Sequence, residues 1–332
     1  MILAGAARAD SASGARPRFA LVDAIRGAAI IGVVIYHCFW DLSYFWLIPV
    51  DVSVDPAWVV FARTLLATFV FLVGVSLVLA HRNGIRWQAF WRRFAIVGGA
   101  ALLVTIGTYI AFPATFVYFG VLHAIALFSL LGLAFLTAPL WLVFVLAVAV
   151  IAGPLLYTHP IFSEPQWSWI GFWAVPPPTN DLVPIFPWFG VTLIGIGATR
   201  WALAAGMAER IGHWQVSGAI SRALVTAGRW SLIIYLVHQP LLLAVIYPLS
   251  TFAFTQTTSV NAFNRTCEAG CLNTGADAAY CTSYCACTLN EIETRDLWAA
   301  VEAPVQTPEQ SAAVSDVILQ CSGVVPPPEA LE

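Results

Sequence analysis

Lysine is absent from this chain of 332 residues, and all fifteen basic residues are arginine. A Schiff base between a lysine and a carbonyl compound is therefore excluded, and with it the covalent attachment of retinal. Charge of either sign is scarce, because Asp, Glu, Lys and Arg make up only 10% of the residues. The net charge of −3 by itself identifies no partner, and we expect no nucleic acid among the ligands.

Apolar residues dominate what is present. They make up 60% of the chain, and the mean hydropathy is +0.81. A water-facing globule of this length cannot bury that much apolar surface, so the sequence predicts an all-α integral membrane protein with the lipid bilayer as its solvent. Fourteen Trp and nine Tyr suit the two membrane interfaces.

Seven apolar runs approach the length of about 20 residues that a helix needs to cross a bilayer. The predicted spans lie near residues 24–46, 57–80, 94–111, 115–136, 139–157, 184–204 and 229–250. Residues 1–22 are predicted to be a disordered cytoplasmic segment, residues 23–252 the membrane bundle, and residues 253–332 a separate tail. Short runs such as "GVSL" and "GIGA" favour close approach between helices.

The placement of arginine orients this predicted bundle. Arginines precede the first span, crowd the loop "HRNGIRWQAFWRR" after the second, and flank the connection between the sixth and seventh. The loops on the opposite side carry Asp51, Asp55, Glu164 and Asp181 and no arginine. We therefore expect a multi-pass protein of the cell (inner) membrane whose N-terminus is cytoplasmic by the positive-inside rule, and seven spans then place the C-terminus outside the cytoplasm.

The tail holds six of the seven cysteines, which agrees with export to an oxidising compartment. Cys267 and Cys271, like Cys281 and Cys285, are four residues apart and share a helix face. Two short antiparallel helices joined at "NTGAD" would therefore be linked by Cys267–Cys285 and Cys271–Cys281, which leaves Cys287 and Cys321 to pair. A zinc site is the alternative for such a cluster, but the tail contains no histidine, and we expect no metal.

The first predicted span carries three ionisable residues, each of which is energetically unfavourable in hydrocarbon. Arg26, His37 and Asp41 are spaced to lie on one helix face. Arg26 and His37 are separated by roughly 16 Å along the axis, which places Arg26 at the cytoplasmic mouth and His37 near the middle of the bilayer. Asp41, one turn further, would orient the His37 imidazole and stabilise its protonated form. The alternative is an interfacial anchor at Arg26 and a packing hydrogen bond at His37.

Three more ionisable residues fall within predicted spans: His123, His238 and Arg63. Ionisable groups at membrane depth usually face the bundle interior and mark a pathway or a reaction site. Arg63 is expected to be a buried charge that meets an anionic ligand or Asp41. A single intramembrane histidine is more often a hydrogen-bond donor between helices than a catalyst, so His123 and His238 remain candidates.

The order of several short motifs resembles a known family. "VDAIRGAAIIGVVIYH" resembles the opening of transmembrane acyltransferases, with Asp, then Arg-Gly, then His eleven residues after the Arg. "FVFLVGVSLVLA", "FGVLHAIAL", "FPWFGVTLIGIGATR" and "GRWSLIIYLVHQPLLL" resemble the bacterial branch of the heparan-alpha-glucosaminide N-acetyltransferase catalytic-domain family. The resemblance covers about residues 18–250 and leaves the cysteine-rich tail outside.

This resemblance implies a membrane acyltransferase that moves an acetyl or short acyl group from cytosolic acetyl-CoA to a cell-envelope glycan or amino sugar on the far side. His37 matches the first-span histidine of the wider superfamily and would be the general base or a transient acyl carrier. Asp41 would orient it, and His123 and His238 would close the site. Arg26, with Arg92 or Arg93 in the loop, would bind the phosphates of the donor.

One feature of the lysosomal members does not carry over. They use a histidine shortly before the second span, and Asp55 stands at the similar place in "DPAW" here.

Two other classes remain open at this level. A transporter or flippase could use the same His, Arg and Asp side chains as a proton or anion pathway, although such proteins typically show internal repeats and broken helices. A receptor or structural protein needs no aligned stripe of ionisable groups. The sequence leaves the acceptor, the acyl chain and a homo-oligomeric state open.

Overall fold

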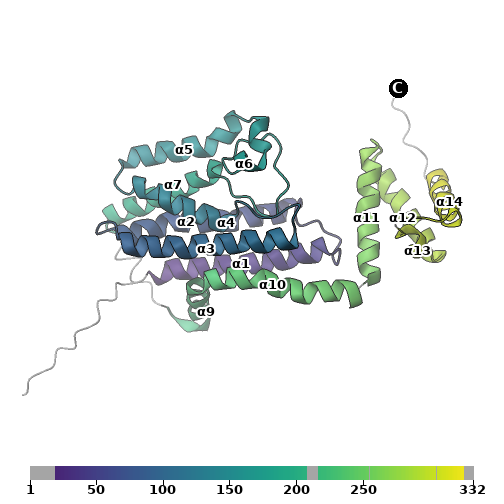
Figure 1. Cartoon of the computed structure of the whole chain (residues 1–332), viewed down its shortest axis with the longest axis horizontal. Helices are drawn as coiled ribbons and strands as arrows, with labels where there is room; N and C mark the ends of the chain where they lie inside the picture. The colour runs from purple at the N-terminus through teal and green to yellow at the C-terminus, as the bar shows by residue number, and fades with distance from the viewer. Residues whose placement is uncertain (1–18, 208–215, 254, 304, 325–332) are drawn as a thin grey trace, which may run out of the picture. The chain divides into compact units, whose positions relative to one another are not determined.

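The computed structural model describes residues 19–207, 216–253, 255–303 and 305–324. These residues form helices joined by connections of different lengths (Figure 1). They also contain an isolated bridge between Phe119 and Leu182. The predicted all-α class is therefore confirmed for the described part of the chain. The predicted disordered segment falls mostly on residues 1–18, outside the described ranges, while Ala20–Val22 already belong to the first helix.

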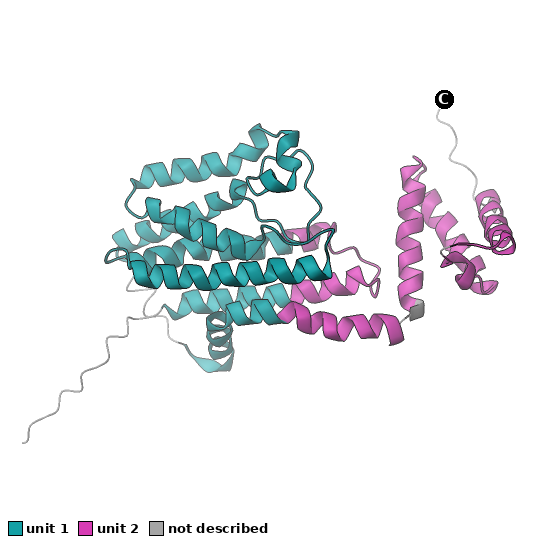
Figure 2. Cartoon of the chain, viewed as in Figure 1, with its two compact units in different colours: residues 1–34, 61–237 teal, residues 35–60, 238–332 magenta. Residues whose placement is uncertain are grey.

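The chain divides into two compact units (Figure 2). Unit 1 contains the described residues up to Val34 together with Phe61–Val237, and unit 2 contains Ile35–Val60 together with the described residues from His238 onward. Three long helices contribute residues to both units: α1 (Ala20–Tyr44), α2 (Pro56–His81) and α10 (Ser231–Pro248).

Unit 1 is a helical bundle. Besides parts of the three shared helices it contains α3 (Trp87–Ala111), α4 (Val121–Gly132), η1 (Leu133–Phe135), α5 (Leu140–Leu156), η2 (Pro160–Ser163), α6 (Pro165–Ser168), α7 (Ile185–Ala204) and α9 (Gly218–Arg229). Its core gathers apolar side chains of α2, α4, α5 and α7 around Phe128, Leu193 and Ile196, each of which is fully buried.

Glycine allows α2 and α7 to cross with their backbones in contact. A Cβ built on Gly74 would lie 2.2 Å from the Thr192 carbonyl oxygen, and one built on Gly195 would lie 2.3 Å from the Phe71 carbonyl oxygen. The Thr192 hydroxyl donates a 2.9 Å hydrogen bond to the Val70 carbonyl at the same crossing. The close approach predicted for "GVSL" and "GIGA" is therefore confirmed, because these glycines belong to those two runs.

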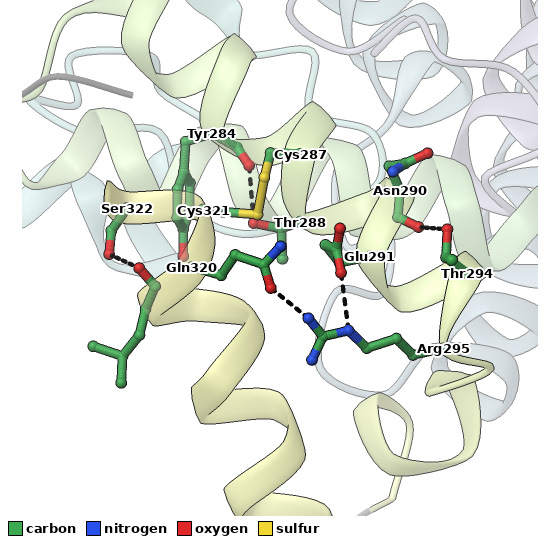
Figure 3. The surroundings of a disulfide bond; sticks show 11 residues. Tyr284, Cys287, Thr288, Asn290, Glu291, Thr294, Arg295, Gln320, Cys321 and Ser322 are labelled. Atoms are coloured by element: carbon green, nitrogen blue, oxygen red, sulfur yellow. Dashed lines mark hydrogen bonds and ion pairs between the residues drawn. A yellow bond between two sulfur atoms is a disulfide. The ribbon is translucent and has the colours of Figure 1, made fainter. Parts of the chain in front are cut away.

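Unit 2 combines the remaining parts of α1, α2 and α10 with the cysteine-rich segment. That segment contains the π-helical turn η3 (Leu249–Ala253), α11 (Thr255–Asn273), α12 (Ala278–Thr294), α13 (Trp298–Val301) and α14 (Pro308–Val324). Disulfides join Cys267 to Cys285, Cys271 to Cys281, and Cys287 to Cys321. These are the pairs that the spacing predicts, and Figure 3 shows the last of them.

Four helices among the described residues are long and apolar enough to cross a membrane: α1, α2, α3 and the helix Ser231–Phe252. The helices Val121–Phe135 and Leu140–Leu156 are apolar but shorter. The number of spans and their orientation therefore remain predictions.

Two predicted boundaries were wrong. α3 begins at Trp87 rather than near residue 94, so Arg92 and Arg93 are helical rather than part of a loop. The helix predicted from residue 115 begins only at Val121. The backbone before it pairs with the segment leading into α7, through Asn180 N–H to the Thr115 carbonyl and Val183 N–H to the Phe119 carbonyl. Hydropathy alone does not separate such an extended apolar segment from a helix.

Candidate functional site

Two histidines from distant parts of the sequence lie side by side in unit 2. His37 on α1 and His238 on α10 have ring centroids 5.0 Å apart, with the ring planes tilted by 60°. His238 is 8% exposed, and the Tyr36 ring packs edge-on against His37. The structure thus brings together His37 and His238, which the sequence predicts as catalytic together with Asp41 and His123.

A hydrogen bond between side chains joins the same two helices next to this pair. The Gln239 amide nitrogen donates to Asp41 Oδ1 over 2.6 Å, and Asp41 is fully buried. Asp41 lies one turn after His37, and Gln239 follows His238 directly, so the bond connects α1 and α10 at the level of the histidines. The role predicted for Asp41, to orient His37, stays a prediction, since the partner that the structure gives Asp41 is Gln239.

Three buried polar atoms of this cluster have no hydrogen-bond partner among the described residues: His37 Nδ1, Asp41 Oδ2 and Gln239 Oε1. Buried polar groups are nearly always paired, so each exception calls for an explanation such as a ligand, a water molecule or a catalytic role. A carboxylate oxygen and an amide oxygen accept hydrogen bonds, and so does an unprotonated imidazole nitrogen. The cluster therefore presents acceptors to a group that carries several N–H or O–H donors.

The cysteine-rich segment contacts the end of α1 and the turn after it. This part of the chain follows His37 and Asp41 in the sequence. The Arg265 guanidinium donates to the carbonyls of Ser43 (2.8 Å) and Ile48 (3.0 Å), and it lies 3.6 Å from an Asp51 carboxylate oxygen. It also stacks 4.3 Å above the ring of Trp46. Asn261 donates to the Trp46 carbonyl over 2.8 Å.

Trp46 occupies an unusual backbone conformation at this point. Its φ is 59°, in the left-handed region that glycine normally supplies after a helix. The Trp46 N–H donates to the Ser43 carbonyl and the Leu47 N–H to the Leu42 carbonyl, which closes the C-terminus of α1. A left-handed residue with a side chain costs roughly 1–2 kcal/mol, so the contacts from α11 are what offset this conformation.

An arginine-lined cavity lies in unit 1. Its volume is about 150 Å³, and its polar lining comes from α2, the start of α3, and α4: Ser76, His81, Arg86, Arg93 and Ser129. The Arg26 guanidinium donates to the Ser76 hydroxyl over 3.0 Å and to an Asp23 carboxylate oxygen over 2.8 Å. We refer to this cavity as the arginine cavity.

The arginine cavity suits an anionic group. His81 Nδ1 lies 2.9 Å from the Leu77 carbonyl oxygen and must donate to it, which leaves Nε2 buried with no partner in the described residues. When protonated, that nitrogen is a second donor. Guanidinium groups recognise phosphate through paired hydrogen bonds, so Arg86 and Arg93 on the lining provide the chemistry for a phosphate.

The other two predicted arginines do not join this cavity. Neither Arg92 nor Arg63 is among the residues that line the cavity. Arg63 is exposed, so the expectation of a buried charge at that position was wrong. An arginine in an apolar run can place its long side chain on the outside of a bundle, and the position in the sequence does not reveal this.

His123 lies in unit 1, at the start of α4. Its Nδ1 accepts from the Gly120 N–H over 3.3 Å, and its Nε2 lies 3.3 Å from the Thr105 hydroxyl. The Thr105 hydroxyl donates to the Val117 carbonyl over 2.7 Å, so it accepts from a proton on Nε2. Both ring nitrogens are engaged in joining α3 to the N-terminus of α4, and the structure does not group His123 with His37 and His238.

Asp181 also forms a hydrogen bond with the start of α4. One of its carboxylate oxygens accepts from the Val121 N–H over 2.8 Å. The residue lies in the connection before α7, and burial raises the pKa of its carboxyl group to about 6. Asp181 and His123 thus secure two backbone donors where the extended segment turns into a helix.

The described residues are almost entirely helices and the turns between them, and four of these helices are long and apolar enough to cross a bilayer, which indicates a membrane protein. Residues 18–240 match the family described as "Heparan-alpha-glucosaminide N-acetyltransferase, catalytic", and the chain belongs to this family. Membership indicates a membrane acetyltransferase. Comparisons with curated proteins and with solved structures gave no match.

Sequence reasoning missed several of the residues described above. Gln239 was visible as a second polar residue beside His238 in an otherwise apolar run, so a signal for it existed. His81 and Arg86 were assigned to a loop, and their approach to Arg93 depends on how α2 and α3 pack. No local pattern places Arg265 on the turn after α1, because more than 200 residues separate them.

Proposed function

We propose that this protein transfers an acetyl or short acyl group from cytosolic acyl-CoA to a sugar-type acceptor on the extracytoplasmic side of the membrane. The family match supplies the reaction class, and residues 18–240 include the histidine pair, Asp41 and Gln239. The observation that carries the proposal is the set of buried acceptor atoms beside the histidine pair. An amine or a sugar hydroxyl brings the donors that these atoms need.

In the proposed reaction His37 is the general base. Its unprotonated ring nitrogen takes the proton of the acceptor N–H or O–H group as the nitrogen or oxygen attacks the thioester carbonyl. The new C–N or C–O bond forms, the C–S bond breaks, and the coenzyme thiolate leaves and takes up the proton. Asp41 and Gln239 hold the acceptor through their remaining oxygen atoms, and the adjacent His238 ring restricts the position of His37.

The arginine cavity supports the donor half of the proposal. Phosphate groups of acyl-CoA carry negative charge, and Arg86 and Arg93 offer donors on the cavity wall. Arg26 contributes through its contact with Ser76. The arginine-rich ends of the helices also follow the positive-inside pattern, which supports access from the cytosol.

The test is acceptor-dependent release of the coenzyme thiol by the purified protein in detergent, with labelled acetyl-CoA and a cell-envelope glycan extract. Transfer of label to the glycan fraction supports the proposal. No transfer to any glycan fraction, with donor bound to folded protein, would overturn it.

Two neighbouring arginines provide a matched comparison for the donor. Arg93→Ala should raise the KM for acetyl-CoA about tenfold or more, since a charge-assisted hydrogen bond to phosphate contributes about 1.5–3 kcal/mol. Arg92→Ala should change the KM less than twofold, because Arg92 does not line the cavity. Equal effects of the two substitutions would remove the arginine cavity from the donor site.

A further inference from the structure

A second pocket lies within unit 2, on a segment that the family match does not cover. Its volume is about 400 Å³, and its walls are Pro49 from the turn after α1, one face of α11 and one face of α12. The family match ends at residue 240, so both helices lie beyond it. We refer to this feature as the tail pocket.

The lining of the tail pocket follows helical spacing on both helices. The residues from α11 are Asn261, Asn264, Arg265 and Glu268, and those from α12 are Thr282, Ala286, Leu289, Asn290 and Glu293. Side chains three, four and seven residues apart share a helix face, so each helix turns one predominantly polar face to the pocket. Two helices that met only to form a core would place apolar faces together.

Disulfides fix the spacing of these two helices. Cys267–Cys285 and Cys271–Cys281 link α11 to α12 with Cα–Cα distances of 5.9 Å and 5.6 Å. The covalent links hold the helix pair together without an apolar seam along its whole length. The polar faces therefore remain available to a ligand.

The charge that remains available in the tail pocket is negative. Arg265 donates to two backbone carbonyls and its charge is paired with that of Asp51, while its buried Nε has no hydrogen-bond partner among the described residues. Glu268 and Glu293 have no ion-pair partner within the described ranges. Asn264, Thr282 and Asn290 add amide and hydroxyl groups that can both donate and accept hydrogen bonds.

We propose that the tail pocket is a binding site for a cationic saccharide, a ligand with several hydroxyl groups and a protonated amine. The two carboxylates attract the amine, while the amide and hydroxyl side chains pair with sugar hydroxyls. Pro49, Ala286 and Leu289 supply apolar surface for the carbon face of the ring. This site goes beyond the proposed acyl transfer, and it stands whether or not the protein carries out that reaction.

The experiment uses two oligosaccharides of equal length, a glucosamine trimer and its fully N-acetylated counterpart, with the whole protein in detergent and isothermal titration calorimetry. The glucosamine trimer should bind, and the neutral trimer should bind at least tenfold more weakly. Binding of the charged trimer should weaken as salt is raised, because the carboxylates lie at or near the surface. Equal affinity for the two trimers, or no binding of either, would overturn the proposal.

Variants then locate the binding site. Glu268→Gln combined with Glu293→Gln keeps the shape of both side chains and should lower the affinity for the glucosamine trimer at least tenfold. Glu309→Gln, on the exposed first turn of α14, should leave it unchanged. Unchanged affinity in the double variant would place the ligand elsewhere and refute the proposal.

Discussion

The helices within unit 1 and those within unit 2 are held together by different kinds of contact. In unit 1 the helices touch through glycine, and backbone carbonyls receive hydroxyl groups such as that of Thr192. The cysteine-rich helices of unit 2 are polar: disulfides join α11 to α12, and Arg265 joins α11 to the end of α1. Lipid offers no hydrophobic force between helices, so tight packing must supply the attraction in a bundle of this kind. A small polar helix pair in water has too little apolar surface to bury and needs covalent links.

The units also differ in where chemistry can occur. Unit 1 offers an arginine-lined cavity and a histidine whose two nitrogens are both engaged. Among the described residues, unit 2 offers the histidine pair with the unpartnered atoms His37 Nδ1, Asp41 Oδ2 and Gln239 Oε1, and the tail pocket. Under the proposed acyl transfer, unit 1 would bind the donor, and unit 2 would provide the reacting groups.

The sharpest test of this division compares the removal of His37 in unit 2 with the removal of His123 in unit 1. His37→Ala should lower acyl transfer about 100-fold or more, the usual loss when an acid–base group is removed. His123→Ala should lower transfer far less and should instead reduce stability, because His123 joins α3 to α4. Steady-state kinetics on purified, folded variants with labelled acetyl-CoA measures both. Near-normal transfer by His37→Ala would show that the histidine pair is structural.

The next test breaks the covalent links of unit 2. Replacing Cys267 and Cys285 together by serine should destabilise the cysteine-rich segment by about 3 kcal/mol on the chain-entropy account of a loop of this size. Limited proteolysis with and without the substitution should show faster cleavage within α11 and α12 and unchanged cleavage in unit 1. Equal protection of the segment in both proteins would mean that its own packing suffices.

The corresponding test in unit 1 uses glycine. Gly195→Ala should destabilise the bundle by about 2 kcal/mol or more, since its Cβ would meet the Phe71 carbonyl oxygen at 2.3 Å and the two helices would have to separate. Gly98→Ala on α3 is the matched control, because nothing lies within 4 Å of its Cβ position. That substitution should be neutral or stabilising by about 0.5–1 kcal/mol. Thermal unfolding of the two variants in the same detergent would compare their stabilities. Equal changes in the unfolding temperature would contradict the close crossing of α2 and α7.

Two arginines of the cysteine-rich segment provide a subtler comparison. Arg265→Ala should destabilise the turn after α1 by about 1.5–3 kcal/mol, as it removes charged hydrogen bonds to the Ser43 and Ile48 carbonyls. Arg295 pairs with carboxylates at the surface, including Glu291 (Figure 3), so Arg295→Ala should have a much smaller effect. Hydrogen exchange of the amides of residues 45–48 would report the difference. Unchanged exchange in Arg265→Ala would show that the turn is stable without the guanidinium.

The last test concerns the pH dependence of stability in unit 1. The raised pKa of Asp181, about 6, means that the folded protein binds this proton more tightly than the unfolded chain does. Its contribution to stability is therefore fully present at pH values below the ordinary range of an Asp carboxyl, and it is lost as the pH rises through about 6. Asp181→Asn should flatten this part of the stability profile while its amide oxygen keeps the bond to Val121 N–H. A profile with the same slope in both proteins would assign the pH dependence to other groups.

The histidine cluster shows how far sequence reasoning reached. The spacing of His37 and Asp41 placed both on one face of a helix, and His238 was recognised as a polar residue within a span. Gln239 was overlooked, although it is the hydrogen-bond partner of Asp41. Periodicity relates residues within one helix, but it contains no information on which residue of another helix lies opposite. His123 also lies in an apolar run, so the sequence made it a candidate on the same grounds as His238. The structure places His123 in unit 1 and His238 in unit 2.

The sequence by itself determined the features that depend on composition and short-range spacing. Apolar content predicted the membrane environment, four-residue spacing predicted the cysteine pairs, and glycine-containing runs predicted a close approach between helices. Only the tertiary structure decided that Arg93 lines a cavity while Arg92 and Arg63 do not, and that Arg265 holds the turn after α1. The physical reason is that helix propensity and hydropathy act over a few residues. The direction of a long side chain and its distant partner follow from how whole helices pack.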